Sequence, residues 1–119
     1  MVSILIIDDS AFGRKMISKA IKVTGWDILE ASNGKEGLEI VRTGQLDCIL
    51  LDITMPEMNG REFLENLKTG NFDVPVIIVT ADIQTSTQEE FLAMGAKAVI
   101  TKPPEDDTLV EAVKMVIKG

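Results

Sequence analysis

A chain of 119 residues, 45% of them hydrophobic, is long enough for one globular domain with an adequate core, and we expect a single domain over residues 1–119. The net charge of -7 and the scattered basic residues argue against a protein that binds DNA or RNA directly. The absence of histidine excludes imidazole bases, Ser-His-Asp triads and nearly all zinc sites.

The first part of the chain predicts two units, each a strand followed by a helix. A strand is expected over residues 3–7. A helix is expected to begin near Ser10 and to end at Gly25. The second strand, 28–31, is short and polar, as suits the edge of a sheet, and the second helix covers about 33–44. The residues expected to face the core are Phe12, Met16, Ala20 and Ile21 of the first helix and Leu38 and Val41 of the second.

Three further units of the same kind follow. Their strands are expected over 48–51, 74–79 and 98–100. Their helices are expected over about 59–70, before Gly95, and from about Pro104 onward. The core residues of these helices are expected to be Phe63, Leu64, Leu67, Phe91, Leu92, Met94, Leu109, Val113, Val116 and Ile117. Because short connections favour right-handed crossovers, the alternation predicts an α/β fold: a doubly wound, parallel five-stranded sheet with helices on both faces.

Polar residues follow four of the five predicted strands. Asp8 and Asp9 come after the first strand, Asp52 after the third, Thr80 after the fourth and Lys102 after the fifth. In open α/β sheets the ligand site lies outside the carboxyl ends of the strands, so these side chains are expected to share one pocket. Three neighbouring carboxylates repel one another and favour a hard cation with oxygen ligands, for which Mg²⁺ is the natural choice.

Each of these residues, taken alone, has a common structural explanation. An acid after a strand is often a solvated loop residue or the N-cap of a helix. A threonine at a strand end often bonds the backbone, and a single lysine is usually a surface residue. Because all of them lie at the ends of strands that share one sheet edge, the set favours a functional site.

An ordered set of short motifs extends over essentially the whole chain: Asp8-Asp9, Asp52 with Met55-Pro56 and Gly60, Thr80-Ala81 and Lys102-Pro103. This set resembles the receiver domain of two-component response regulators, and most of all the single-domain, chemotaxis-type receivers. The resemblance implies a flavodoxin-like (βα)5 fold with strand order 2-1-3-4-5. It also implies a phosphorylation-activated switch of a phosphorelay that is not an enzyme, beyond catalysing its own Mg²⁺-dependent phosphorylation and dephosphorylation.

The resemblance assigns a role to each motif. Asp52 would be the nucleophile that accepts a phosphoryl group from a sensor histidine kinase or a phosphotransfer protein and becomes an aspartyl phosphate. Asp8, Asp9, Asp52 and the backbone carbonyl of Thr54 would hold Mg²⁺, with Mn²⁺ as a possible substitute. The residues that would bind the phosphoryl group are Thr54, Thr80, Ala81 and Lys102, of which Lys102 and Thr80 would assist catalysis.

The switch departs from the usual family pattern at one position. Receivers commonly carry an aromatic residue three positions before the lysine, and here that residue is Val99. We therefore expect Thr80, Val99 and Pro103 to form a switch led by the backbone, with a cis Lys102-Pro103 peptide bond. A downstream effector is expected to bind the face of the fourth helix, fifth strand and fifth helix, and the protein is expected as a monomer or a phosphorylation-dependent dimer.

The sequence also bears on three alternative functions. A phosphate-independent pseudo-receiver would act only as an interaction module, and the complete set of acids, threonine and lysine argues against it. A metal-dependent small-molecule phosphatase of the haloacid-dehalogenase type would need an Asp-x-Asp pair, but residue 54 is threonine. A flavodoxin-like binder of a flavin or nucleotide would need a glycine-rich phosphate loop, which the sequence lacks.

Two further features bear on where the protein is located and on the role of its cysteine. No apolar stretch approaches the roughly 18 residues that span a bilayer, so we expect a cytoplasmic protein without membrane insertion. The single cysteine, Cys48, lies within an apolar strand and is expected to act as a small buried hydrophobic residue without a redox role.

Overall fold

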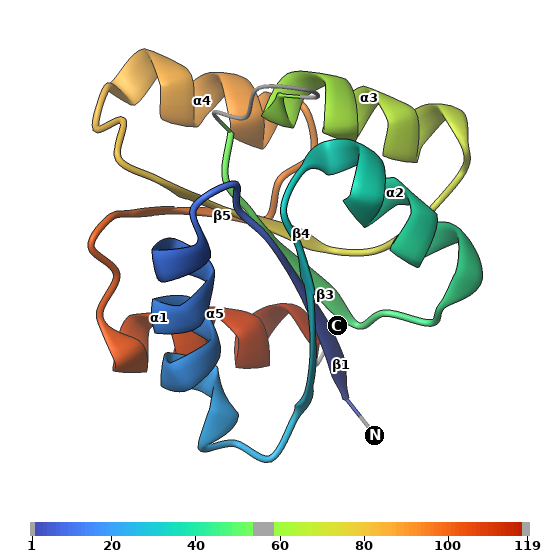
Figure 1. Ribbon diagram of the computed structural model, residues 1–119. Helices are drawn as coiled ribbons and strands as arrows, with labels where there is room; N and C mark the ends of the chain where they lie inside the picture. The colour runs from blue at the N-terminus through green and yellow to red at the C-terminus, as the bar shows by residue number, and fades with distance from the viewer. Residues whose placement is uncertain (1, 54–58, 118–119) are drawn as a thin grey trace.

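One parallel sheet of five strands, in the order β2-β1-β3-β4-β5, forms the centre of the molecule (Figure 1). The computed structural model describes residues 2–53 and 59–117. The strands are β1 Ser3–Ile7, β2 Asp27–Ala31, β3 Cys48–Leu51, β4 Val76–Thr80 and β5 Ala98–Thr101. The helices that alternate with them are α1 Ala11–Lys22, α2 Gly34–Thr43, α3 Gly60–Thr69, α4 Thr85–Ala93 and α5 Asp106–Ile117. The predicted fold class and strand order are confirmed.

The helices cover both faces of the sheet. Figure 1 shows α1 and α5 on one face and α2, α3 and α4 on the other. Because successive side chains of a strand point to opposite faces, Ile4 and Ile6 of β1 pack toward α1 and α5, whereas Leu5 and Ile7 pack toward the other three helices. All four of these side chains are fully buried, which explains why the inner strands are continuous apolar runs.

Three of the helices begin where the sequence predicts, because a polar side chain caps each of them. The side-chain oxygens of Ser10, Asn33 and Asn59 accept hydrogen bonds from backbone N–H groups in the first turns of α1, α2 and α3. Gly25 and Gly95 follow α1 and α4 with positive φ angles of 82° and 109°, a conformation that glycine adopts without strain. None of the helices in the described part of the chain has the length and apolar character that a bilayer crossing requires.

Three residues predicted to face the core are exposed instead. Phe12 is 75% exposed, Met16 53% and Leu92 47%. The buried stripe of α1 consists of Ile17, Ala20 and Ile21, which lies beside the row that Phe12 and Met16 occupy. Helical periodicity identifies an apolar side but not its exact centre, and the packing of α1 against the sheet and α5 decides which row is covered.

Two predicted boundaries are also wrong by two residues. β4 begins at Val76 rather than at residue 74, and Pro75 lies just before it, with its carbonyl accepting the N–H of Ile49. Proline has no N–H to give to a strand ladder, which is consistent with this position. α5 begins at Asp106 rather than near Pro104, and its first helical hydrogen bond runs from the N–H of Leu109 to the carbonyl of Glu105.

The thiol of Cys48 is expected to be unreactive in the folded protein. Cys48 is fully buried in β3, and burial raises the pKa of its thiol to about 12, so the nucleophilic thiolate is absent at neutral pH. Because the folded pKa lies above the ordinary thiol value of 9.0, the contribution of this group to stability is fully present below about pH 9 and is lost as the pH rises from there through about 12. A thiol-reactive disulfide reagent should label Cys48 in urea but not in native buffer at pH 8; rapid native labelling would contradict this burial.

Candidate functional site

The carboxyl ends of four strands place the predicted site residues at one edge of the sheet. Asp8 and Asp52 directly follow β1 and β3, Thr80 is the last residue of β4, and Lys102 directly follows β5. The carboxylate groups of Asp8, Asp9 and Asp52 each offer an oxygen within 4.8 Å of the other two. The structure therefore brings together the three acids that the sequence singled out.

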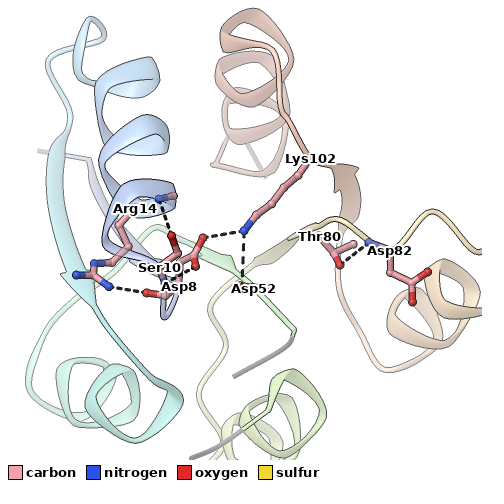
Figure 2. A network of polar contacts seen from close by, with 8 residues as sticks. Asp8, Ser10, Arg14, Asp52, Thr80, Asp82 and Lys102 are labelled. Carbon is pink, nitrogen blue, oxygen red and sulfur yellow. Dashed lines mark hydrogen bonds and ion pairs between the residues drawn. The ribbon is translucent and has the colours of Figure 1, made fainter. Parts of the chain in front are cut away.

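Asp8 is the buried member of the acidic group, with an exposed fraction of only 1%. One carboxylate oxygen accepts the backbone N–H of Ser10 at 2.9 Å, and the other accepts the ammonium group of Lys102 at 2.9 Å (Figure 2). A buried carboxylate is tolerated only when hydrogen bonds or ion pairs replace its hydration, and Asp8 has both. Asp9, by contrast, is exposed.

Lys102 connects two of the three acids. Its Nζ atom lies 2.9 Å from Oδ2 of Asp8 and 3.8 Å from Oδ2 of Asp52, whose side chain is 12% exposed. The backbone N–H of Lys102 donates to the carbonyl of Thr80 at 2.7 Å, which fixes the start of the lysine side chain beside β4. Three carboxylates beside one ammonium group leave two negative charges in excess, and this all-oxygen donor set fits a divalent cation such as Mg²⁺.

Two residues of α1 border the acids and were not identified from the sequence. Gly13 lies so close to Asp8 that a Cβ atom built on it would meet Oδ2 of that carboxylate at 2.7 Å. Arg14 donates from Nη1 to the backbone carbonyl of Asp8 at 2.7 Å. A glycine in the first turns of an otherwise ordinary helix was the available signal for the close approach, since glycine weakens a helix interior. No local sequence pattern indicated a role for Arg14.

Thr80 and the loop after it connect the site to α4. Thr80 is 2% exposed, and its hydroxyl oxygen accepts the backbone N–H of Asp82 at 3.1 Å. The carboxylate of Asp82 accepts the N–H of Gln84 and the hydroxyl of Thr87, both at 2.9 Å. Asp82 thus holds the first turn of α4, whose N-cap residue makes no side-chain capping bond of its own.

The other site residues predicted from the sequence lie in the following places. The Lys102-Pro103 peptide bond is cis, as predicted. Val99 is half-buried and packs against the core cluster beneath α2, α3 and α4, and Ala81 is exposed beside Thr80. Thr54, to which a metal-binding carbonyl and a phosphate contact were assigned, lies outside the described residues, as do Met55 and Pro56.

A cavity of about 480 Å³ opens between α1 and the segment that joins β5 to α5. Lys102 and Pro103 line it from one side, and Phe12 and Met16 line it from the other. The two α1 side chains that fail to reach the core thus form an apolar surface beside the acidic site.

Comparisons with known proteins agree with this geometry. The family described as response regulator receiver domain matches residues 4–114. The chemotaxis protein CheY of Thermotoga maritima is 35% identical to this chain over 97% of both chains, and the protein PilH of Pseudomonas aeruginosa is 32% identical over the full length of both. The receiver domain of the Francisella response regulator 1452 is 31% identical, with a TM-score of 0.93 over 99% of this chain and 98% of that one. The Vibrio cholerae chemotaxis protein CheY4 is 28% identical, with a TM-score of 0.90 over 98% of both chains.

Proposed function

This chain belongs to the response regulator receiver family, and we propose that Asp52 is the phosphoryl acceptor through which it acts. It is a receiver of the CheY type, a phosphorylation-activated switch of two-component signalling and not an enzyme in the ordinary sense. The observation that carries the assignment is the position of Lys102, whose ammonium group lies between the carboxylates of Asp8 and Asp52 at the sheet edge where a phosphoryl group would attach.

The acidic group provides the ligands for a divalent cation. Receiver domains bind Mg²⁺ at an acidic pocket, and here Asp8, Asp9 and Asp52 would hold Mg²⁺ or, in its place, Mn²⁺. The backbone carbonyl of Thr54 is proposed as a further ligand on family resemblance alone. When bound, the cation neutralises the charge of the phosphoryl oxygens during transfer.

Phosphoryl transfer requires a nucleophile and a positive charge in fixed positions. A carboxylate oxygen of Asp52 would attack the phosphorus of a phosphohistidine, forming a P–O bond while the P–N bond to the imidazole breaks. The Lys102 ammonium group, 3.8 Å from Asp52, is placed to exchange its contact with Asp8 for a phosphoryl oxygen. Because Asp8 is buried and already hydrogen-bonded to Ser10, it remains in place when the lysine moves.

The same phosphoryl group would operate the switch. The hydroxyl oxygen of Thr80 accepts the Asp82 N–H, so its own proton can be donated to a phosphoryl oxygen, with Ala81 beside it at the phosphate. Drawing Thr80 inward would pull Asp82 and the start of α4. With Val99 in place of an aromatic ring, the change would run mainly through this backbone and through the Pro103 segment.

The proposed partners fit two surfaces. A sensor histidine kinase or phosphotransfer protein would approach over the acids, where Phe12 and Met16 offer apolar contact. A downstream effector would bind the face of α4, β5 and α5, where Leu92 is exposed and Ile83 stands just before α4. We propose one receiver domain over residues 1–119 that is cytoplasmic, monomeric or dimeric after phosphorylation, and without direct nucleic-acid contact.

The experiment that tests this function is intact-mass measurement after incubation with acetyl phosphate. The expected result is the gain of one phosphoryl group in the presence of Mg²⁺ and no gain in EDTA. A protein that binds Mg²⁺ but gains no phosphoryl group from acetyl phosphate or from a panel of phosphorylated histidine kinases would instead be a pseudo-receiver. Continuous hydrolysis of small phosphate esters would indicate a phosphatase.

Replacing Lys102 by alanine is expected to separate phosphoryl transfer from metal binding. Loss of a positioned charge that faces the transferring group should slow phosphorylation by acetyl phosphate about 10²-fold, by analogy with the loss of a preorganised donor. Because the lysine neutralises Asp8 and Asp52, its removal should leave Mg²⁺ affinity unchanged or tighter. The control is Lys97→Ala, which removes an exposed lysine from the opposite end of β5. An equal rate in Lys102→Ala and Lys97→Ala would remove Lys102 from the mechanism.

A further inference from the structure

The first turns of α1 contain a charged residue that the functions assigned above do not use. We propose that Arg14 is a positioning residue for the acidic site, which holds the turn between β1 and α1 so that Asp8 and Asp9 stay in register with Asp52. This inference rests on the proposed function of that site. It concerns the pocket itself, because Arg14 contacts the backbone of Asp8 rather than its carboxylate.

The guanidinium group of Arg14 is fixed at two points. Nη1 donates to the backbone carbonyl of Asp8 at 2.7 Å, a short charge-assisted hydrogen bond (Figure 2). Nε lies 3.3 Å from Oε1 of Glu30 in β2, and the arginine side chain is only 19% exposed. The planar group thus spans from the end of β1 to the neighbouring edge strand, and Glu30 holds it there from outside the site.

Together with two other hydrogen bonds, this contact closes the turn on itself. The N–H of Ser10 donates to the Asp8 carboxylate at 2.9 Å, and the N–H of Arg14 donates to the Ser10 carbonyl at 2.9 Å. The side chain of Arg14 then returns to the Asp8 carbonyl, so the three residues form a closed ring of contacts around the backbone that carries Asp9. Because Asp9 is exposed, the position of its carboxylate depends on the position of its backbone.

The charge of Arg14 and its positioning role predict opposite effects on metal binding. A positive charge near three acids opposes the binding of a cation, so removing the charge alone would strengthen Mg²⁺ binding. Removing a support of the ligand-bearing turn would weaken Mg²⁺ binding, because the ligands must then be ordered when the metal binds. The direction of the change in Arg14→Gln therefore separates the two explanations.

The first test is titration of the protein with Mg²⁺ alone, measured by calorimetry. Arg14→Gln is expected to weaken Mg²⁺ affinity about tenfold, as losses of supporting contacts around metal ligands commonly do. Arg14→Lys, which keeps the charge but cannot span both contacts, should also weaken it, because no loss of positive charge offsets the lost contact. The matched control is Arg42→Gln, which makes the same change at an exposed arginine in the last turn of α2. Unchanged or tighter binding in Arg14→Gln would overturn the proposal.

The second test needs no metal. Amide hydrogen exchange should be faster at Ser10 in Arg14→Gln than in the wild type, whereas the amide of Asp82, which is bonded to Thr80 at the other side of the site, should be unchanged. Equal acceleration at both amides would indicate a general loss of stability and would contradict a positioning role. Neither test uses a phosphoryl donor, so both results stand even if Asp52 is not phosphorylated.

Glu30 provides an independent check on how Arg14 is held. Glu30→Gln should weaken Mg²⁺ affinity in the same direction as Arg14→Gln but by a smaller factor. Loss of the negative charge of Glu30 acts in that direction by itself, so the double variant separates this effect from an effect through Arg14. If Glu30 acts through Arg14, the double variant should bind Mg²⁺ as weakly as Arg14→Gln alone. Fully additive losses would show that Glu30 does not act through the arginine.

Discussion

Asp52→Asn is expected to abolish phosphoryl incorporation from acetyl phosphate, with no mass gain at times when the wild type is fully modified. An asparagine amide has nearly the same shape as the carboxylate but is not an effective nucleophile toward phosphorus. It also removes one of the three carboxylates proposed to hold the metal, so Mg²⁺ affinity should fall together with phosphorylation. Intact-mass measurement with saturating Mg²⁺ separates these two effects, because metal supply is then no longer limiting.

A suitable control for Asp52→Asn is Asp73→Asn, the same substitution at an exposed acid between α3 and β4. It should gain the phosphoryl group at the wild-type rate. The folded state of Asp52→Asn should be at least as stable as the wild type, because one of three mutually repelling charges is removed while Lys102 keeps its bond to Asp8. Full phosphorylation of Asp52→Asn would show that another residue is the acceptor.

Phe63→Ala is expected to cost about 3–5 kcal/mol in the free energy of unfolding, the usual range for a buried phenylalanine. Phe63 of α3 is fully buried within the core cluster beneath α2, α3 and α4. Its ring lies so near α2 that a Cβ atom added to Gly37 would come within 3.3 Å of Cε1. Because domains of this size are stable by about 5–15 kcal/mol, this one substitution should remove a large part of the total.

Urea unfolding followed by the fluorescence of Trp26 measures this loss. Trp26 is half-buried on the opposite face of the sheet, so its signal reports global unfolding rather than the local cavity. Phe12→Ala is the control, because it removes the same side chain from a position that is 75% exposed and should change the stability by no more than about 0.5 kcal/mol. A loss below about 1 kcal/mol in Phe63→Ala would mean that the core around α3 can collapse onto the cavity.

Much of the fold could be predicted because the sequence patterns that indicate its strands and helices are local. The apolar run Cys48–Leu51 has no polar residue to face water, which indicates a strand covered on both faces, and it is fully buried in the centre of the sheet. Asn33 and Asn59 predicted helix starts because a side-chain cap acts within its own turn.

Predictions failed where several local patterns were compatible with the same residues. Phe12 and Met16 form an apolar row on α1 as regular as the one that is buried, and only the packing of α1 on the sheet and α5 distinguishes the two rows. Leu92 likewise lies one position from Phe91, which α4 buries completely. The contact of Arg14 with Asp8 left no trace in the sequence, because it depends on the angle at which α1 leaves β1.

The chemical groups at the strand ends were predictable without coordinates, because each strand end depends on residues that are adjacent in the chain. The strand pattern therefore predicted Asp8, Asp9, Asp52, Thr80 and Lys102 as neighbours. The burial of Asp8, the exposure of Asp9 and the pairing of Lys102 with Asp8 across 94 residues became known from the folded molecule alone. This burial and this pairing depend on how the sheet twists and on how α1 packs against it. Both are properties of the whole core rather than of any one segment.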